Sequence, residues 1–211
     1  MFVPPHFEEA RAEVLAALIR AHPLGTLVTL GARGLNANHL PFLLDPDPAP
    51  HGTLTGHVSR ANPAWRDFDR EVQALVVFQG ADSYITPSWY PTKRHTGKVV
   101  PTWNYAVVHA YGFLRVVEDA TRLRAIVERL TAEHEASRPQ PWKASDAPPE
   151  YIEQMLRGIV GIEIAIARLV GKWKASQNRD RADRDGVAEG LRGLGDPAAA
   201  AMAELVRRSN S

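Results

Sequence analysis

Residues 99–112 read VVPTWNYAVVHAYG, and this stretch decides the fold because a polar, aromatic segment runs directly into an apolar one. Residues 105–117 are apolar enough to form one long strand. Residues 87–104 lack periodicity, and a loop of that length inside a compact domain is usually functional or disordered. Their aromatic content argues against disorder. We therefore expect a ligand loop at 99–104 and a barrel strand from 105 to 112, in which His109 is structural.

Further strands are indicated on both sides of this stretch. The apolar or alternating segments that predict them are 24–30, 35–44, 53–59, 72–80, 83–87 and 160–170. The turn GARG at 31–34 predicts a hairpin between the first two. TLTGHVS at 53–59 alternates strictly, which places Thr53, Thr55, His57 and Ser59 on one face. That polar face points at solvent or at a ligand.

Helices are predicted at the start, middle and end of the chain rather than between every pair of strands. Apolar positions at helical spacing predict helices at 8–21, 120–136 and 148–159, with two more between 183 and 208. This order favours an antiparallel α+β or barrel fold over a doubly wound one. We expect a single domain over 1–211. Its parts are an N-terminal helix at 8–21, a barrel at about 24–117 and 159–175, and helices at about 120–158 and 183–208.

Composition excludes several classes of protein. The 211 residues, 45% of them hydrophobic, suffice for one sizeable core. There are no cysteines, so disulfides, thiolate metal sites and cysteine nucleophiles are excluded. The net charge of +1 gives no global attraction for a polyanion. Apolar runs are too short to span a membrane, and the N-terminus lacks a secretory signal pattern. We expect a cytoplasmic protein.

Aromatic, cationic and amide side chains are concentrated in two irregular segments. Their members are Ser88, Trp89, Tyr90, Lys93, Lys98, Thr102, Trp103, Asn104, Lys172, Trp173, Lys174, Ser176, Gln177 and Asn178. A planar heteroaromatic ligand that carries a phosphate needs this mixture of stacking faces, ring hydrogen-bonding groups and cations. An equally good interpretation is that the tryptophans close the ends of the barrel and the lysines are solvated.

SRANP at 59–63 offers two interpretations as well. Ser59, Arg60 and Asn62 make an anion site at a helical turn, or Ser59 or Asn62 is an ordinary helix cap, which the residues alone favour. Glu163 is a structural carboxylate with a partner or a catalytic one.

Signatures of other protein classes are missing from the sequence. The chain has no dinucleotide-binding glycine pattern, P-loop, zinc-binding histidine pair or serine nucleophile elbow. It has no basic recognition helix for DNA either. No residue stands out as a general acid or base.

Five strings carry a resemblance to a known family. In order along the chain they are NANHLPF, GHVSRANP, ITPSWYP, GKVVPTWNYAVVHAYG and GKWKASQN. They closely resemble the PaiB family, described as FMN-binding negative transcriptional regulators. The resemblance spans almost the whole chain. It implies a split β-barrel like that of pyridoxamine phosphate oxidases and flavin reductases, a bacterial cytoplasm, and a homodimer with FMN in the cleft between subunits.

The resemblance also implies which residues hold FMN. The segment after the polar strand would bind the phosphate, which replaces the preference for a bare helix cap at 59–63. Its residues are His57, Ser59, Arg60 and Asn62. The hairpin edge, Asn38, His39 and Leu40, would line the isoalloxazine ring. Thr102, Trp103 and Asn104 would reach beneath it. Trp173, Lys174 and Gln177 would come from the last strand, of either subunit, and Ser88, Trp89 and Lys98 complete the expected set.

Three functions remain open at this point. The first is an FMN-binding regulator, in which DNA binding rests on the family description. The second is a flavin-dependent oxidoreductase, with Trp103, Asn104 and His39 shaping a small-substrate pocket. The third is a binder or degrader of haem on the same barrel, with histidines as axial ligands. No metal site belongs to the first two.

Overall fold

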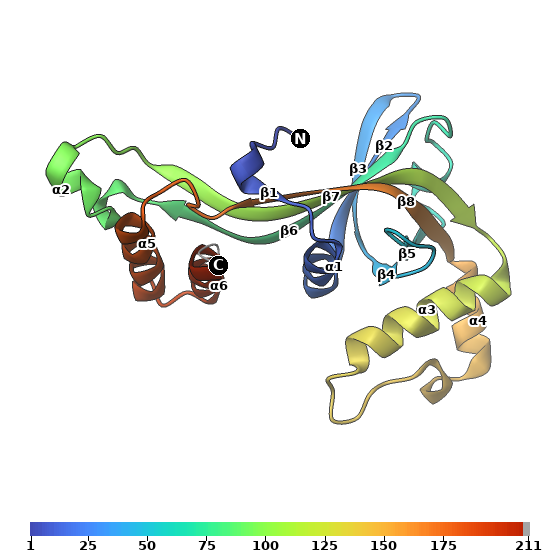
Figure 1. Cartoon of the computed structure of the whole chain (residues 1–211). Helices are drawn as coiled ribbons and strands as arrows, with labels where there is room; N and C mark the ends of the chain where they lie inside the picture. The colour runs from blue at the N-terminus through green and yellow to red at the C-terminus, as the bar shows by residue number, and fades with distance from the viewer. Residues whose placement is uncertain (209–211) are drawn as a thin grey trace. The chain divides into compact units, whose positions relative to one another are not determined.

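The computed structural model describes residues 1–208, which group into two compact units (Figure 1). Unit 1 consists of Met1–Leu18, Gln79–Val108 and the described part of Val170–Ser211. Unit 2 consists of Ile19–Phe78 and His109–Leu169. The single domain predicted over 1–211 includes three residues outside the described part, and it stays a prediction. No helix in residues 1–208 is long and apolar enough to cross a membrane.

An antiparallel sheet runs through the chain, as the short links between strands predict. Seven strands follow the order β3-β2-β6-β7-β8-β5-β4, and β1 pairs with β8. Their bounds are β1 Glu8–Glu9, β2 Leu24–Gly31, β3 Gly34–Pro41, β4 Leu43–Asp45, β5 Thr53–Ser59, β6 Ala74–Ile85, β7 Thr102–Val117 and β8 Ile159–Lys174. The α+β prediction is confirmed.

Unit 2 contains β2, β3, β4 and β5 in full. The β2–β3 hairpin pairs from Leu24 opposite Pro41 to Gly31 opposite Gly34, as predicted. A Cβ on Gly56 of β5 would lie 2.8 Å from the carbonyl oxygen of Pro41 at the end of β3. The two strands therefore approach each other closely enough that a side chain at position 56 would clash.

Two helices belong to unit 2, and Figure 1 shows them side by side. They are α3 (Ala120–Glu135) and α4 (Pro149–Arg157). α3 buries Leu123, Ile126 and Leu130, and the last two pack with Val117 of β7. These are positions i, i+3 and i+7 of the predicted helix, so its apolar stripe faces the core as expected.

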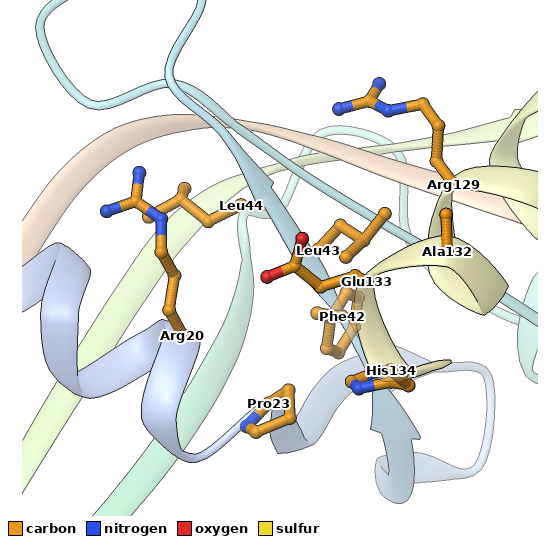
Figure 2. Close-up of a pocket in the computed structure, with 9 residues that line it drawn as sticks. All are labelled: Arg20, Pro23, Phe42, Leu43, Leu44, Arg129, Ala132, Glu133 and His134. Carbon is orange, nitrogen blue, oxygen red and sulfur yellow. The ribbon is translucent and has the colours of Figure 1, made fainter. Parts of the chain in front are cut away.

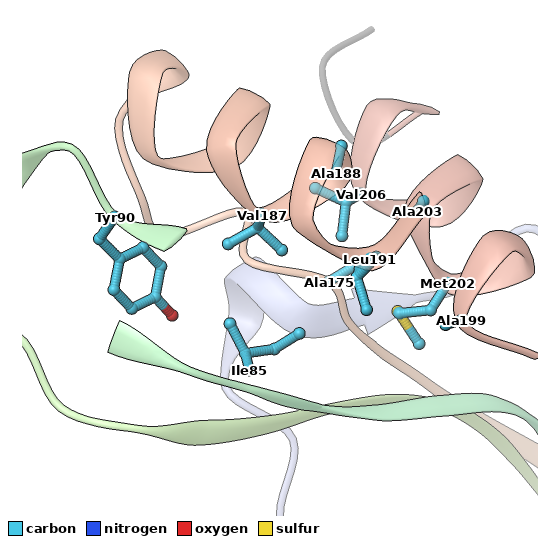
Figure 3. Packing of buried hydrophobic residues seen from close by; sticks show 10 residues of the cluster. All are labelled: Ile85, Tyr90, Ala175, Val187, Ala188, Leu191, Ala199, Met202, Ala203 and Val206. Carbon is cyan, nitrogen blue, oxygen red and sulfur yellow. The ribbon is translucent and has the colours of Figure 1, made fainter. Parts of the chain in front are cut away.

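Unit 1 has its own core, which Figure 3 shows between the sheet and two helices. The helices are α5 (Arg181–Gly193) and α6 (Pro197–Arg208). The buried members of this core are Ile85, Tyr90, Ala175, Val187, Ala188, Leu191, Ala199, Met202, Ala203 and Val206. The short α2 (Thr92–Thr96) lies in the same unit, and α1 (Ala12–Ala21) begins there.

Four predicted boundaries are wrong. The first helix begins at Ala12 rather than at residue 8, because Glu8 and Glu9 pair with Lys172 and Gly171 of β8. One strand, β6, replaces the two predicted at 72–80 and 83–87. The single strand predicted at 35–44 is divided into β3 and β4. β7 begins at Thr102, so residues 102–104 belong to a strand and only 97–101 remain a loop.

Glu163 is held by a two-point ion pair, which favours its structural interpretation. Arg122 Nε and Nη2 donate to its carboxylate oxygens at 2.9 and 2.6 Å, and the Glu163 side chain is 11% exposed. Removal of one partner leaves a largely buried charge uncompensated. We expect Arg122→Ala to lower the free energy of unfolding by about 2 kcal/mol, since Arg122 itself is partly solvated. Urea denaturation measures this.

Arg124 provides the matched control, two positions along α3. It makes an exposed i, i+4 ion pair with Glu128 at 3.8 Å. Such pairs contribute about 0.3–0.5 kcal/mol at most. An Arg122→Ala effect no larger than that of Arg124→Ala would contradict a stabilising role for the Arg122–Glu163 pair.

Candidate functional site

Unit 1 brings the TWN and KWKASQN strings into contact. β7 and β8 are neighbours in the sheet, and each string lies at the end of its strand. Lys174 Nζ donates to Thr102 Oγ1. Asn104 Nδ2 donates to Ser176 Oγ at 2.9 Å. We call Thr102, Asn104, Lys174, Ser176 and Gln177 the Asn104 cluster.

Asn104 has an unusual environment for an amide. It is 1% exposed, and its Oδ1 is buried with no hydrogen-bond partner in residues 1–208. A buried acceptor without a donor costs about 1–3 kcal/mol. Its partner Ser176 has a φ of +63°, in the left-handed region that non-glycine residues seldom occupy. Such strained positions concentrate at functional sites. Ser176 was noted in the sequence only as one of many polar residues.

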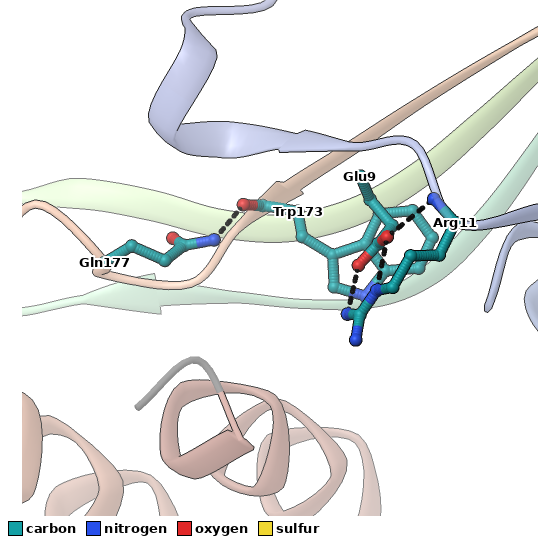
Figure 4. A network of polar contacts seen from close by, with 4 residues as sticks. All are labelled: Glu9, Arg11, Trp173 and Gln177. Atoms are coloured by element: carbon teal, nitrogen blue, oxygen red, sulfur yellow. Dashed lines mark hydrogen bonds and ion pairs between the residues drawn. The ribbon is translucent and has the colours of Figure 1, made fainter. Parts of the chain in front are cut away.

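Gln177 acts within its own turn. Its Nε2 donates to the carbonyl oxygen of Trp173 at 2.5 Å (Figure 4). Its Oε1 accepts from Ala175 N–H at 2.7 Å. Both side-chain groups are therefore occupied by the backbone that leads to Ser176. Gln177 holds the shape of the Asn104 cluster rather than offering a free amide.

The tryptophans that flank this cluster differ in exposure. Trp103 is 51% exposed, its indole N–H donates to Asp82 Oδ1 at 2.8 Å, and its ring meets Tyr84 edge-on at 6.0 Å. Figure 4 shows the Trp173 ring beside the ion pair of Glu9 and Arg11. Hydrogen bonds from the Arg11 guanidinium hold the pKa of Glu9 below its ordinary value. Trp103 thus presents an exposed aromatic face, whereas Trp173 is half-buried.

Trp89 fits the alternative in which a tryptophan closes the structure. A Cβ on Gly190 of α5 would lie 2.4 Å from the Trp89 indole, so the ring lies directly on that helix. Ser88 accepts from Lys93 Nζ at 3.4 Å. Lys98 is exposed in the loop before β7. The structure thus gives Trp89 a packing role, and the roles predicted for Ser88 and Lys98 stay predictions.

Unit 2 brings the hairpin edge and the segment after β5 together. Asn62 Nδ2 donates to Asn38 Oδ1 at 2.8 Å. Asn62 Oδ1 accepts from Ala64 N–H at 2.9 Å, so Asn62 is also a helix cap. Ser59 Oγ accepts from Ala61 N–H at 3.3 Å. Asn62 therefore fits the helix-cap interpretation of SRANP, and the anion site stays a prediction. His39 is exposed on β3, and Leu40 is buried.

Arg60 is more constrained than the sequence indicates. Its guanidinium donates to Glu118 Oε2 at 3.1 Å and to the carbonyl oxygens of Arg157 and Ile159 at 3.0 and 3.2 Å. A guanidinium has five N–H groups, so these three contacts leave two. Arg60 keeps the capacity to bind one anionic oxygen pair, from a fixed position.

His57 lies on β5 and gives a prediction for pH. Burial lowers the pKa of its imidazole below the ordinary value, and burial also lowers that of His109. The unfolded chain then binds more protons than the folded chain just below the ordinary histidine pKa of about 6.5. We expect the urea midpoint to be constant above about pH 7 and to fall as the pH is lowered toward about 5. A His57→Asn variant should show a shallower decline.

The exposed His22 is the control for this experiment. A His22→Asn variant should follow the wild-type curve. A His57→Asn curve that is as steep as wild type would contradict the assignment of the pH dependence to His57. His109 contacts Tyr111 through Nδ1 at 3.4 Å, which agrees with its predicted structural role.

A cavity of about 460 Å³ lies elsewhere in unit 2 (Figure 2). Arg20, Phe42, Arg129, Glu133 and His134 are among the residues that line it. None of the residues predicted to bind a ligand lines this cavity. In the described residues, no group of three histidines or acids is arranged to hold a metal ion.

Comparisons with known proteins agree with this fold. A family model described as "Putative FMN-binding domain" matches residues 1–168. An uncharacterized protein, AN0679 of Emericella nidulans, is 37% identical over 98% of this chain and 96% of its own length. The protease synthase and sporulation protein PAI 2 of Bacillus subtilis is 34% identical over 98% of this chain and 96% of its own length.

Solved structures of low sequence identity share the fold. One is the FAD and heme binding protein of Mycobacterium smegmatis, with a TM-score of 0.60 and 17% identity, covering 87% of this chain and 80% of that one. At this identity the likeness concerns the fold alone. Relatives occur in both Emericella nidulans and Bacillus subtilis, and the bacterial cytoplasm implied by the resemblance stays a prediction.

Proposed function

Because the chain belongs to the family described as "Putative FMN-binding domain", we propose that it binds FMN, and that the Asn104 cluster is part of the binding site. The resemblance to the PaiB family is confirmed by the Bacillus relative. The proposal rests on Asn104 Oδ1, which is buried and has no hydrogen-bond partner in the described residues. The same cluster contains Lys174, whose ammonium group donates to Thr102. The flavin ring bears an N–H group that can donate a hydrogen bond to an amide oxygen such as this one.

The side chains around this acceptor fit a flavin nucleotide. Trp103 offers an exposed aromatic face on which a planar ring can stack. Lys174 and the exposed Lys98 are cations of the kind that bind phosphate or ring oxygens. In unit 2, Arg60 with two free N–H groups and the hydroxyl of Ser59 form a second set suited to a phosphate. When bound, FMN would supply redox chemistry or act as a sensor ligand.

We further propose a cytoplasmic homodimer with FMN in the cleft between the subunits, and a role as a negative transcriptional regulator. The support for the dimer and the regulator is the PaiB resemblance. Size-exclusion chromatography with light scattering tests the dimer, and a monomeric FMN-loaded protein would contradict it. Gel-shift assays test direct DNA binding, and the absence of sequence-specific shifts would remove the direct form of regulation.

The test of FMN binding is an absorption spectrum of the purified protein followed by release and identification of the chromophore. FMN in the released fraction, or saturable fluorescence quenching on titration of FMN, is the expected result. A haem spectrum, or no binding of FMN by the folded protein, would overturn the proposal. Bleaching of the bound flavin by NADH, NADPH or a reduced deazaflavin would add the oxidoreductase function to it.

A further inference from the structure

A second cavity, of about 540 Å³, lies within unit 2 and shares no residue with the proposed FMN site. Thr55 of β5 and Glu163 of β8, which are opposite each other in the strand register, line it. Arg115 of β7 lines it as well, and α3 contributes Arg122, Ile126 and Arg129. Volumes of about 300–1,000 Å³ are typical of sites for small molecules.

Most of the charge in this cavity is already paired. Arg122 binds Glu163, and Arg129 Nη2 lies 2.9 Å from Asp45 Oδ2. These pairs neutralise four of the charged side chains. They also fix the positions of Arg122 and Arg129 through contacts within unit 2.

Four polar side chains that line the cavity have no ion pair or side-chain hydrogen bond in the described part of the chain: Asp47, Thr53, Thr55 and Arg115. The carboxylate of Asp47 repels an anion, so a bound anionic group would have to lie at Arg115 and Thr55. Thr55 is 5% exposed, and its Oγ1 is buried with no partner in the described part of the chain. Arg115, on β7, has neither an ion pair nor a side-chain hydrogen bond there. A buried hydroxyl without a partner is destabilising, and native proteins seldom retain one without a reason such as a ligand or a bound water. The unpaired guanidinium of Arg115, an exposed residue that lines the same cavity, supplies five donors and no acceptor.

We propose that this cavity binds a small organic anion, a carboxylate or a phosphate with an apolar body. Arg115 would bind the anionic group through paired N–H donors, which match the planar fork of a carboxylate or two phosphate oxygens. The Thr55 hydroxyl would donate a further hydrogen bond. Ile126 and Ala125 of α3, together with Ala165 of β8, provide apolar surface for the rest of the molecule.

The experiment uses the full chain, with and without FMN, and three probes that share a phenyl ring: benzoate, phenyl phosphate and benzamide, the neutral counterpart of benzoate. Saturation-transfer NMR detects binding, and isothermal titration calorimetry measures affinity. We expect at least one anion to bind, with benzamide at least about tenfold weaker, because a charge-assisted hydrogen bond is worth about tenfold to a hundredfold in affinity. The better of the two anions identifies the class as carboxylate or phosphate.

Two variants and one control make the assignment specific. Arg115→Ala should lower the affinity for the anion by about tenfold to a hundredfold. Thr55→Val should lower this affinity by a smaller factor, because it removes only one neutral hydrogen bond. Valine keeps the shape of threonine without its hydroxyl. Arg138→Ala removes an exposed arginine that does not line the cavity and should leave affinity unchanged. Circular dichroism confirms that each variant is folded.

Three results would overturn the proposal. They are no binding of either anion by the folded wild type, equal affinity for benzamide, and unchanged anion affinity in Arg115→Ala. The FMN titration is a separate readout, because Arg115 is outside the residues proposed for FMN. An Arg115→Ala protein that binds FMN normally but not the anion is the expected outcome. If the wild-type protein does not bind FMN, the proposed function is refuted. The anion titrations then still test this cavity independently.

Discussion

A Gly112→Ala variant is expected to lose about 3 kcal/mol or more of its free energy of unfolding, the largest stability change we predict from a single added methyl group. The Cβ at this position would lie 2.1 Å from the carbonyl oxygen of Ala165 and 2.8 Å from Ile164 Cγ2. The first of these atoms is backbone of β8, the neighbour of β7 in the sheet. It cannot turn aside as a side chain would, so the two strands would have to separate and weaken their ladder.

Gly193→Ala is the matched control. A Cβ there would meet no atom within 4 Å, and Gly193 is the last residue of α5. Alanine is favoured over glycine in helices, so this variant should gain up to about 0.5–1 kcal/mol. Urea denaturation followed by circular dichroism measures both. A Gly112→Ala protein as stable as wild type would mean that β7 and β8 do not approach each other this closely.

Gly112 also illustrates how far the sequence determines the fold. Residues 105–112 predict a strand because apolar and β-branched residues accumulate there, and β7 contains them all. Likewise the alternation of 53–59 is β5 to the residue. The close backbone approach at Gly112 has no local signal, since it depends on Ala165 more than 50 positions later.

The wrong boundaries have the same origin. β1 has only two residues, too few to show a period, and it exists because Gly171 and Lys172 of β8 lie opposite it. β6 was predicted as two strands because Gly80 and Asp82 interrupt the apolar run. In the structure Asp82 accepts from the Trp103 indole, so the polar residue serves a neighbouring strand instead of ending its own. Pairing with distant residues overrides local pattern in each case.

The candidate site divides along similar lines. The order of the strings placed Thr102, Asn104 and Lys174 in one expected site, and two hydrogen bonds now connect β7 with the end of β8. The internal partners of Arg60 were not foreseen, because Glu118 and Ile159 are far from it in sequence. The cavity at Arg115 and Thr55 was not foreseen either, because its lining residues come from five separate segments of the chain.

FMN affinity is expected to fall about tenfold to a hundredfold in Lys174→Ala, because a charge-assisted hydrogen bond contributes about 1.5–3 kcal/mol. Lys174 Nζ donates to Thr102 Oγ1, which leaves two of its three N–H donors. Lys174→Arg keeps the charge and should retain most of the affinity. Fluorescence quenching of FMN on titration with each protein gives the dissociation constants.

The control for Lys174 is Lys143→Ala, which removes an exposed lysine outside the Asn104 cluster and should bind FMN as wild type does. Asn104→Leu removes the unpartnered acceptor without a large change of side-chain volume. If the flavin ring donates a hydrogen bond to this acceptor, the variant should also lower the affinity for FMN. Asn104→Leu also removes the hydrogen bond to Ser176, so its FMN affinity is interpreted together with that of Lys174→Ala. Unchanged affinity in both Lys174→Ala and Asn104→Leu would exclude the Asn104 cluster from the FMN site. A loss confined to Arg60→Ala would then assign the ligand to the segment after β5.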